Sequence, residues 1–303
     1  MASARQSNSP TELTETRLLV SYGFDLARQL NIDKIMVIAE LLTDRKMVDK
    51  HREEETIIWV TSDLESLEGG VEKTDQVVEM PHSPVGRMDQ VSLALILAVM
   101  KGTLTEDESV VCLVGISGSK RLDNLLIVNP KRDFEWFKGR SKQKKSQLPI
   151  SQEFVRLVDI ALKFAAEGRE GKPIGTIFLL GDIDELKTIA RPLILNPCKG
   201  HSKKNRSIHD EDFIETMREF AALDGGFLID RKGAVEGAGV YLDAPVTKRV
   251  KVPKGLGSRH MGAAAATAQT NSLAIVISES SSTVTVFFKG ARVLSLGKPD
   301  PES

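Results

Sequence analysis

Apolar residues in the first part of the chain alternate between helical and strand spacing. Residues 13–30 place apolar side chains at helical intervals, and Asn31 is a suitable end for that helix. Helical patterns at 41–51 and 87–101 alternate with short runs rich in β-branched residues. Buried strands that alternate with helices are typical of a largely parallel sheet covered by helices. The predicted strands are 34–39, 56–60, 76–80 and 110–114.

A second pattern of the same kind follows Pro149. Residues 154–164 predict an amphipathic helix, and 174–180 is an apolar run of strand length. Two short apolar runs on either side of 231–233 predict a hairpin. The other predicted elements of this part are helices at 182–190, 210–222 and 262–270 and strands at 227–230, 235–242, 273–278 and 284–289.

The two patterns predict two α/β domains, which 303 residues accommodate comfortably. We expect a small parallel-sheet domain at 13–130 and a second domain at 150–293. Residues 131–149 are basic and polar, and they favour a solvated linker, although a patch for nucleic acid or an acidic partner is the alternative. We expect a disordered arm at 1–12 and a short tail at 294–303.

Composition narrows the class of protein. Hydrophobic residues make up 41% and charged residues 27%, with a net charge of -1, so nothing global indicates a nucleic-acid or membrane-surface partner. Cys112 and Cys198 lie far apart and offer no disulfide framework, which favours a reducing compartment. The polar N-terminus carries no apolar signal segment, and the apolar stretch 91–100 is too short to cross a bilayer. We therefore expect a soluble cytoplasmic protein.

The residues suited to ligand chemistry gather in the last third of the chain. Asp224-Gly225-Gly226 stands directly before a strand, where glycines let the backbone approach a ligand beside one carboxylate. A helix C-cap followed by a turn is the alternative. The site interpretation therefore needs support from other motifs.

Two further motifs follow at the start of a helix and at the end of a strand. Gly257-Ser258-Arg259-His260 leads into a helix of small residues, with Ser258 as its expected N-cap, and predicts an anion site. A capped helix with a surface Arg-His pair is the alternative. Ser278-Glu279-Ser280 leaves a strand, and its hydroxyls suit either phosphate oxygens or turn backbone groups.

Order and spacing of these motifs resemble those of the diadenylate cyclase (DAC) family. That family pairs Asp-Gly-Ala before a hairpin with Arg-His-Arg at a helix N-terminus and a serine turn after the next strand. The resemblance covers about 150–293 and implies a mixed sheet flanked by helices. The N-terminal domain looks like the pyruvate-kinase C-terminal-type module of archaeal-type members. Gly226 replaces the motif alanine, and Met261 replaces the second arginine, for which Lys251 or Lys254 would have to compensate.

The resemblance implies condensation of two ATP molecules into cyclic di-AMP and two pyrophosphates, with Mn²⁺ or Mg²⁺. One ribose 3′-hydroxyl attacks the α-phosphate of the other ATP across a face-to-face dimer. Asp224 is the implied catalytic residue and metal ligand, with Glu279 as a second metal ligand. The implied nucleotide-binding residues are Asp224, Gly225, Gly226, Tyr241, Leu242, Gly257, Ser258, Arg259, His260, Ser278 and Ser280.

Two other functions remain open at this point. Gly226 and Met261 allow a catalytically weak or inactive sensor that binds ATP or cyclic di-AMP without turnover. A scaffold protein that recruits partners through 131–145 is the third possibility. Binding and turnover of adenine nucleotides separate the three.

Overall fold

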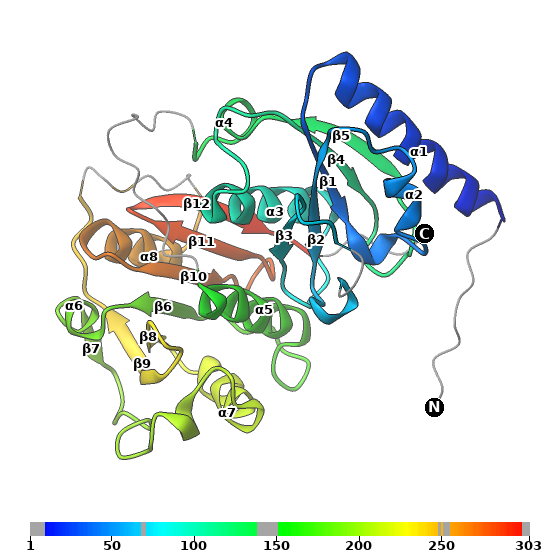
Figure 1. The fold of residues 1–303 in the computed structure, drawn as a ribbon. Helices are drawn as coiled ribbons and strands as arrows, with labels where there is room; N and C mark the ends of the chain where they lie inside the picture. The colour runs from blue at the N-terminus through cyan, green and yellow to red at the C-terminus, as the bar shows by residue number, and fades with distance from the viewer. Residues whose placement is uncertain (1–9, 68–70, 138–150, 248–249, 251–254, 299–303) are drawn as a thin grey trace, which may run out of the picture. The chain divides into compact units, whose positions relative to one another are not determined.

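The computed structural model describes residues 10–67, 71–137, 151–247, 250 and 255–298. The described residues divide into two compact units, one within 10–137 and the other within 151–298. Each unit has its own sheet, as Figure 1 shows. Within the described residues, no helix is both long and apolar enough to cross a membrane.

The N-terminal unit contains a five-stranded sheet in the order β3-β2-β1-β4-β5. The first four strands in the chain pair in parallel, which confirms the parallel-sheet prediction. The last strand, β5, pairs antiparallel with β4 and was not predicted, because only one of its five residues is buried. The strands are β1 (Lys34–Ile38), β2 (Thr56–Thr61), β3 (Gln76–Glu79), β4 (Val110–Val114) and β5 (Asn124–Val128).

Two long helices, α1 (Pro10–Gln29) and α3 (Arg87–Lys101), lie against this sheet (Figure 1). The predicted arm at 1–12 overlaps the first turn of α1, where proline is favoured because its missing N–H is not needed. Residues 1–9 lie outside the described part. Within the helix expected at 41–51, only Lys46–Asp49 and the last residue of a short helix at Ala39–Leu41 are helical. The short helices of this unit are η1 (Ala39–Leu41), α2 (Lys46–Asp49), η2 (Glu65–Leu67) and α4 (Pro130–Asp133).

The basic linker predicted from 131 begins later than its composition indicates. α4 occupies its first residues, and the ring of Phe137 is fully buried. Trp136 packs edge-on against Phe137, with ring centroids 5.0 Å apart. The rest of the predicted linker, 138–149, lies outside the described residues. These aromatic residues therefore belong to the packing of the N-terminal unit.

The C-terminal unit contains a seven-stranded sheet in the order β12-β11-β10-β6-β8-β9-β7. Only β6 and β8 pair in parallel, and the other neighbours pair antiparallel, which confirms the mixed sheet that the resemblance implied. The strands are β6 (Ile177–Gly181), β7 (Ala190–Pro192), β8 (Gly226–Asp230), β9 (Val235–Leu242), β10 (Leu273–Ile277), β11 (Val284–Phe288) and β12 (Ala291–Leu296).

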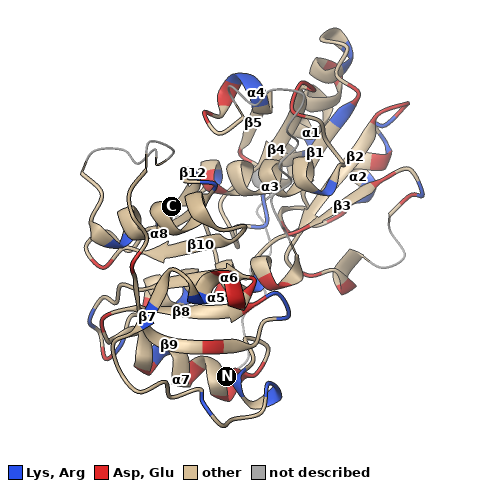
Figure 2. Ribbon diagram, turned by 90° about the vertical axis from the view of Figure 1, so that its left-hand side faces the viewer, with Lys and Arg blue, Asp and Glu red and all other residues tan. Residues whose placement is uncertain are grey.

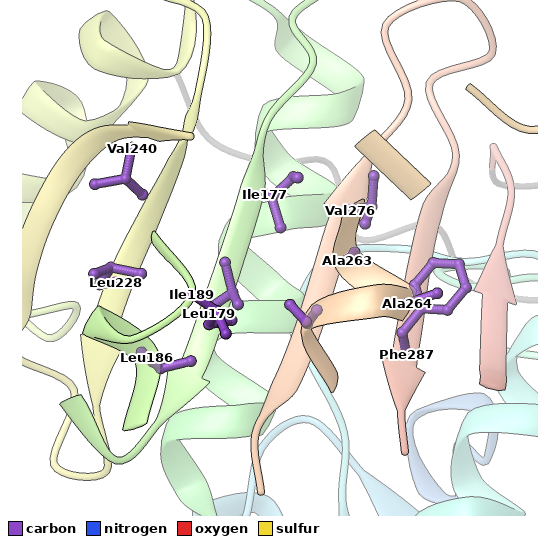
Figure 3. Close-up of a cluster of buried hydrophobic side chains, with 12 residues drawn as sticks. Ile177, Leu179, Leu186, Ile189, Leu228, Val240, Ala263, Ala264, Val276 and Phe287 are labelled. Atoms are coloured by element: carbon purple, nitrogen blue, oxygen red, sulfur yellow. The ribbon is translucent and has the colours of Figure 1, made fainter. Parts of the chain in front are cut away.

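Helices pack on both faces of this sheet. On one face, α8 (Ser258–Gln269) and α6 (Ile183–Lys187) pack against a cluster that includes Leu179 and Phe287 (Figure 3). The four consecutive alanines 263–266 of α8 are fully buried, because small side chains let a helix lie close to a sheet. On the other face, Phe178 packs between Phe164 and Phe227. That face carries α5 (Gln152–Glu167), which is joined to α7 (Glu211–Ala221) by ion pairs.

Three element boundaries differ from the sequence prediction and affect the site. β6 begins at Ile177 rather than at 174, and α8 begins at Ser258 rather than at 262. β12 includes residues assigned to the tail, because a turn at Gly290, with φ +79°, folds them back onto β11. The strand β7 was not predicted, since most of its residues are exposed.

Charge is mixed over the surface of both units. Figure 2 shows Lys and Arg interspersed with Asp and Glu on the described helices and loops, rather than gathered on one basic face. This distribution fits the net charge of -1 and gives no support to a nucleic-acid partner.

Candidate active site

The three sequence motifs meet at one edge of the C-terminal sheet. Asp224 stands before β8, which runs parallel to β6, and Glu279 follows β10, which runs antiparallel to β6. The start of β8, the start of β6 and the end of β10 therefore share an edge. The first turn of α8 supplies Arg259 to the same edge. Sheet topology thus brings together residues that lie up to 55 positions apart (Asp224 to Glu279).

Arg259 connects the two carboxylates of the site. Its Nη1 donates a hydrogen bond to Glu279 Oε2 at 3.1 Å, and its Nη2 lies 3.5 Å from Asp224 Oδ1. The Asp224 side chain is 94% exposed, the Glu279 side chain 59% and the Arg259 side chain 31%. The arrangement is an open cluster of one cation and two anions, accessible to a charged ligand.

Glycines at the start of β8 allow tight backbone packing. Gly225 has φ +114°, and a Cβ at this position would lie 2.9 Å from backbone atoms of Gly239 and Val240. A Cβ on Gly226 would lie 2.7 Å from the carbonyl oxygen of Ile177 in β6. The chain therefore needs glycine at Gly226, where the related motif carries alanine. The close packing of β8 on β6 therefore explains why the methyl group of the motif alanine is absent here.

Gly175 and Thr176 are site residues that the sequence analysis missed. A Cβ on Gly175 would lie 2.7 Å from Arg259 Nη1 and 2.9 Å from Glu279 Cβ, so glycine leaves room for the ion pair. Thr176 is fully buried, and its hydroxyl donates to the Gly225 carbonyl oxygen at 3.1 Å. The sequence prediction placed both residues inside the strand 174–180. A glycine at the start of an apolar run was the one signal in the sequence that could have indicated a close approach at this position.

His260 is buried beneath this edge. It is 5% exposed, and its ring packs edge-on against Phe287, with ring centroids 6.1 Å apart. Its Nε2 atom has no hydrogen-bond partner in the described part of the chain. Burial lowers the pKa of His260, and the positive charges of Arg259 and Arg292 lower it further. The structure thus favours a neutral His260 that packs in the core beneath the first turn of α8.

The first turn of α8 has an open end. Gly257, not Ser258, is its N-cap, and no side chain caps the helix. The Gly257 carbonyl oxygen accepts from the N–H groups of His260 and Met261. The N–H groups of Ser258 and Arg259 precede these bonds, at the positive end of the helix dipole. Met261 is half-buried, and Lys251 and Lys254, proposed to compensate for it, lie outside the described residues.

The serine turn after β10 is held by its own hydroxyls. Ser281 Oγ donates to Ser278 Oγ at 2.8 Å, and Ser278 and Ser280 hydroxyls lie 3.5 Å apart. The Ser278 N–H donates to the Thr283 carbonyl oxygen at 2.9 Å, which closes the turn. The three hydroxyl groups lie at the surface, where a ligand could replace their mutual contacts.

Two further predicted residues lie at the end of β9, on the same sheet edge. The Arg191 guanidinium stacks on the Tyr241 ring, 4.7 Å from its centroid, and Tyr241 is 47% exposed. Leu242 packs against α8, where a Cβ on Gly262 would lie 3.8 Å from Leu242 Cβ. Tyr241 therefore presents a partly exposed aromatic ring at the end of β9, whereas Leu242 belongs to the packing of α8.

The donor set suits a divalent ion that is shared with a substrate. Within the described residues, no three His, Cys, Asp or Glu side chains form a cluster that could hold a metal alone. Asp224 and Glu279 both lie next to Arg259 and supply carboxylate oxygens. Mg²⁺ is commonly held by one or two carboxylates together with substrate phosphates. These two residues fit that pattern.

Two family models match the chain, one in each of its two structural units. Residues 163–292 match the DAC family, described as "DisA bacterial checkpoint controller nucleotide-binding". Residues 15–133 match a family described as "Probable sensor domain DacZ_P". The C-terminal unit therefore contains a DAC domain, and the resemblance stated from the motifs is confirmed.

Two archaeal proteins named diadenylate cyclase are similar to the chain. The protein from Methanocaldococcus jannaschii is 29% identical over 301 residues, which cover 90% of this chain and 94% of that protein. The protein from Haloferax volcanii is 37% identical over 145 residues, covering 48% of this chain and 51% of that protein.

Two solved structures are more distant. DacA from Staphylococcus aureus is 17% identical, with a TM-score of 0.34 over 46% of this chain and 84% of that one. A pyruvate kinase from Cryptosporidium parvum is 19% identical, with a TM-score of 0.31 over 41% of this chain and 23% of that one. The specific likeness of the N-terminal unit to a pyruvate-kinase domain stays a prediction.

Proposed function

We infer that this chain, whose C-terminal unit contains a DAC domain, is a diadenylate cyclase that condenses two ATP molecules into cyclic di-AMP. One observation carries the inference. Arg259, in the uncapped first turn of α8, lies between Asp224 and Glu279 at a single sheet edge. A cation beside two carboxylates suits a triphosphate that arrives with a divalent ion.

The chain's own residues would bind and orient the nucleotide. Arg259 and the first N–H groups of α8 would bind the phosphates, since both direct positive charge to the same place. The Ser278 and Ser280 hydroxyls would bind further phosphate oxygens. Tyr241 would contact the adenine ring, next to the backbone at Gly225 and Gly226. Phosphoryl transfer depends on such positioning more than on covalent help from the protein.

Asp224 is the residue that we assign to the attacking hydroxyl. Its carboxylate would favour loss of the ribose 3′-hydroxyl proton as the new O–P bond forms and the bond to pyrophosphate breaks. Two such steps release two pyrophosphates and close the symmetric product. Asp224 and Glu279 would hold Mn²⁺ or Mg²⁺, which when bound neutralises charge on the phosphates.

A symmetric product requires two ATP molecules to face one another. The C-terminal sheet carries Asp224, Arg259 and Glu279 once, which suits one ATP molecule. A second copy of the chain, related by a two-fold axis, would bring the second ATP. We therefore propose a face-to-face dimer as the active form. We also propose that the protein works in the cytoplasm, as its cysteine usage predicts.

The test is turnover of ATP by the purified full chain with Mn²⁺ or Mg²⁺. We expect cyclic di-AMP and pyrophosphate from the wild type, and neither from Asp224→Asn. Asp212→Asn is the matched control, because Asp212 is an exposed carboxylate in the first turn of α7. ATP binding without pyrophosphate release with either metal would instead establish the sensor function. Absence of any adenine-nucleotide binding would favour a scaffold.

A further inference from the structure

A cavity of about 420 Å³ lies in the N-terminal unit, and none of its lining residues is assigned to the cyclase site. It is lined by residues that end or follow β1, β2, β3 and β4, so it stands at the carboxyl end of the parallel strands. In the sheet, β1 lies between β2 and β4. The chain therefore adds strands first on one side of β1 and later on its other side (Figure 1). Open α/β sheets bind ligands at such a reversal of strand order.

Gln90, in α3, lines this cavity and carries a buried acceptor without a partner. The residue is 3% exposed, and its Nε2 donates to the Val85 and Gly115 carbonyl oxygens at 3.2 and 3.3 Å. Carbonyl oxygens only accept, so these bonds determine which end of the amide is nitrogen. Its Oε1 is buried and has no partner in the described part of the chain. Gln90 Oε1 is therefore an acceptor that no donor in the described part of the chain satisfies.

Glu40 is the second acceptor. Its Oε1 accepts from the Thr61 hydroxyl at 2.7 Å and from the backbone N–H of Ser62 at 2.5 Å, which orients the carboxylate beside β2. The hydrogen bonds described for Glu40 all reach Oε1, so none of them uses Oε2. Glu40 is also the only Asp, Glu, Lys or Arg among the lining residues.

The remaining lining residues combine apolar walls with hydroxyl groups and one histidine, His82. The walls of the cavity include side chains of Ile38, Val60 and Met80 together with prolines. The first N–H groups of α3 belong to residues 87–89, and none of these lines the cavity. No Lys or Arg lines the cavity, so a phosphate or carboxylate would meet the Glu40 carboxylate with only His82 and hydroxyl groups as side-chain donors.

We propose that this cavity binds a small organic ammonium compound with a short apolar body. An ammonium group has three N–H donors and no acceptor, which matches the Glu40 carboxylate and Gln90 Oε1. Its aliphatic part would pack against the apolar walls. The volume falls within the range of small-molecule pockets, roughly 300–1,000 Å³. This site is independent of the proposed cyclase activity, because it lies wholly within the N-terminal unit.

The test is a titration of the ¹⁵N-labelled full chain with n-butylammonium chloride, sodium butyrate and sodium phosphate at equal ionic strength. We expect saturable binding of n-butylammonium only, with shifts of the Gln90 side-chain amide signal, assigned through its loss in Gln90→Met. Glu40→Gln keeps an acceptor oxygen for Thr61 and Ser62 but removes the charge. It should weaken n-butylammonium binding by about tenfold.

Glu65→Gln is the matched control, since Glu65 is exposed and does not line the cavity. The affinity of this variant for n-butylammonium should equal that of the wild type. Binding of butyrate or phosphate as tight as that of n-butylammonium would overturn the proposal. So would absence of saturable n-butylammonium binding, or an unchanged affinity in Glu40→Gln.

Discussion

Arg259 Nη1 donates a hydrogen bond to Glu279 Oε2 at 3.1 Å, which joins the first turn of α8 to the turn after β10. Asp224 Oδ1 approaches the other guanidinium nitrogen, Nη2. The two carboxylates thus share one guanidinium, and each nitrogen of the fork faces a different strand end. The planar shape of arginine permits this division, and lysine would offer only one point charge.

Replacement of Arg259 should remove cyclase activity while leaving the fold intact. We expect Arg259→Ala to lower the rate of cyclic di-AMP formation by about 100-fold, as for loss of one strong electrostatic contact to a transition state. Arg259→Lys should recover only part of that loss. Arg231→Ala is the control, because Arg231 is exposed in the β8–β9 turn, at the opposite edge of the sheet. Equal rates in Arg259→Ala and the control would contradict the assigned role.

Restoring the family alanine at Gly226 should destabilise this chain. The new Cβ would lie 2.7 Å from the Ile177 carbonyl oxygen, so β8 must move away from β6, at a cost of about 1–3 kcal/mol in the free energy of unfolding. Urea denaturation measures the change. In Gly237→Ala the new Cβ would have no neighbour closer than 3.6 Å, so that variant is the control. A Gly226→Ala protein as stable as the wild type would show that the strands adjust freely.

Stability should fall as the pH drops below about 6.5, partly through His260. Its pKa is lowered from the usual 6.5, so between that value and the lowered one the unfolded chain binds more protons than the folded chain. Acid therefore lowers the free energy of unfolding in this range. Above pH 6.5, His260 does not contribute to the pH dependence of the free energy of unfolding. His260→Gln should flatten this part of the melting-temperature profile. Replacement of the exposed His209 by Gln should leave the profile unchanged. Parallel profiles for wild type and His260→Gln would rule out this contribution.

Specific activity should depend on protein concentration if two copies complete the reaction. Near the dimer dissociation constant, the rate should rise faster than linearly with concentration and approach linearity above it. Initial rates measured over a wide dilution series, beside a sedimentation measurement of the dimer, test this expectation. Strict linearity through the range in which the dimer dissociates would exclude a shared reaction centre.

Sequence periodicity predicted most of the elements, because buried strands and amphipathic helices carry their own spacing. The helix at 87–101 was predicted with its observed bounds, and the buried strand at 110–114 likewise. Elements without a buried pattern, such as β5 and β7, were missed. β12 was missed because its second half, 294–296, had been assigned to the tail, and only pairing with β11 makes these residues a strand.

The sequence by itself determined which residue types the candidate site contains and in what order they occur. Motif order and family resemblance predict Asp224, Arg259 and Glu279 as site residues, but they do not predict a contact between them. Only the tertiary structure decided that Arg259 joins both carboxylates, that Gly175 leaves room for this contact, and that His260 is buried rather than exposed. Strand direction and register decide which loops share an edge, and local sequence does not encode them. Contacts across a sheet therefore come from the packing of the whole unit.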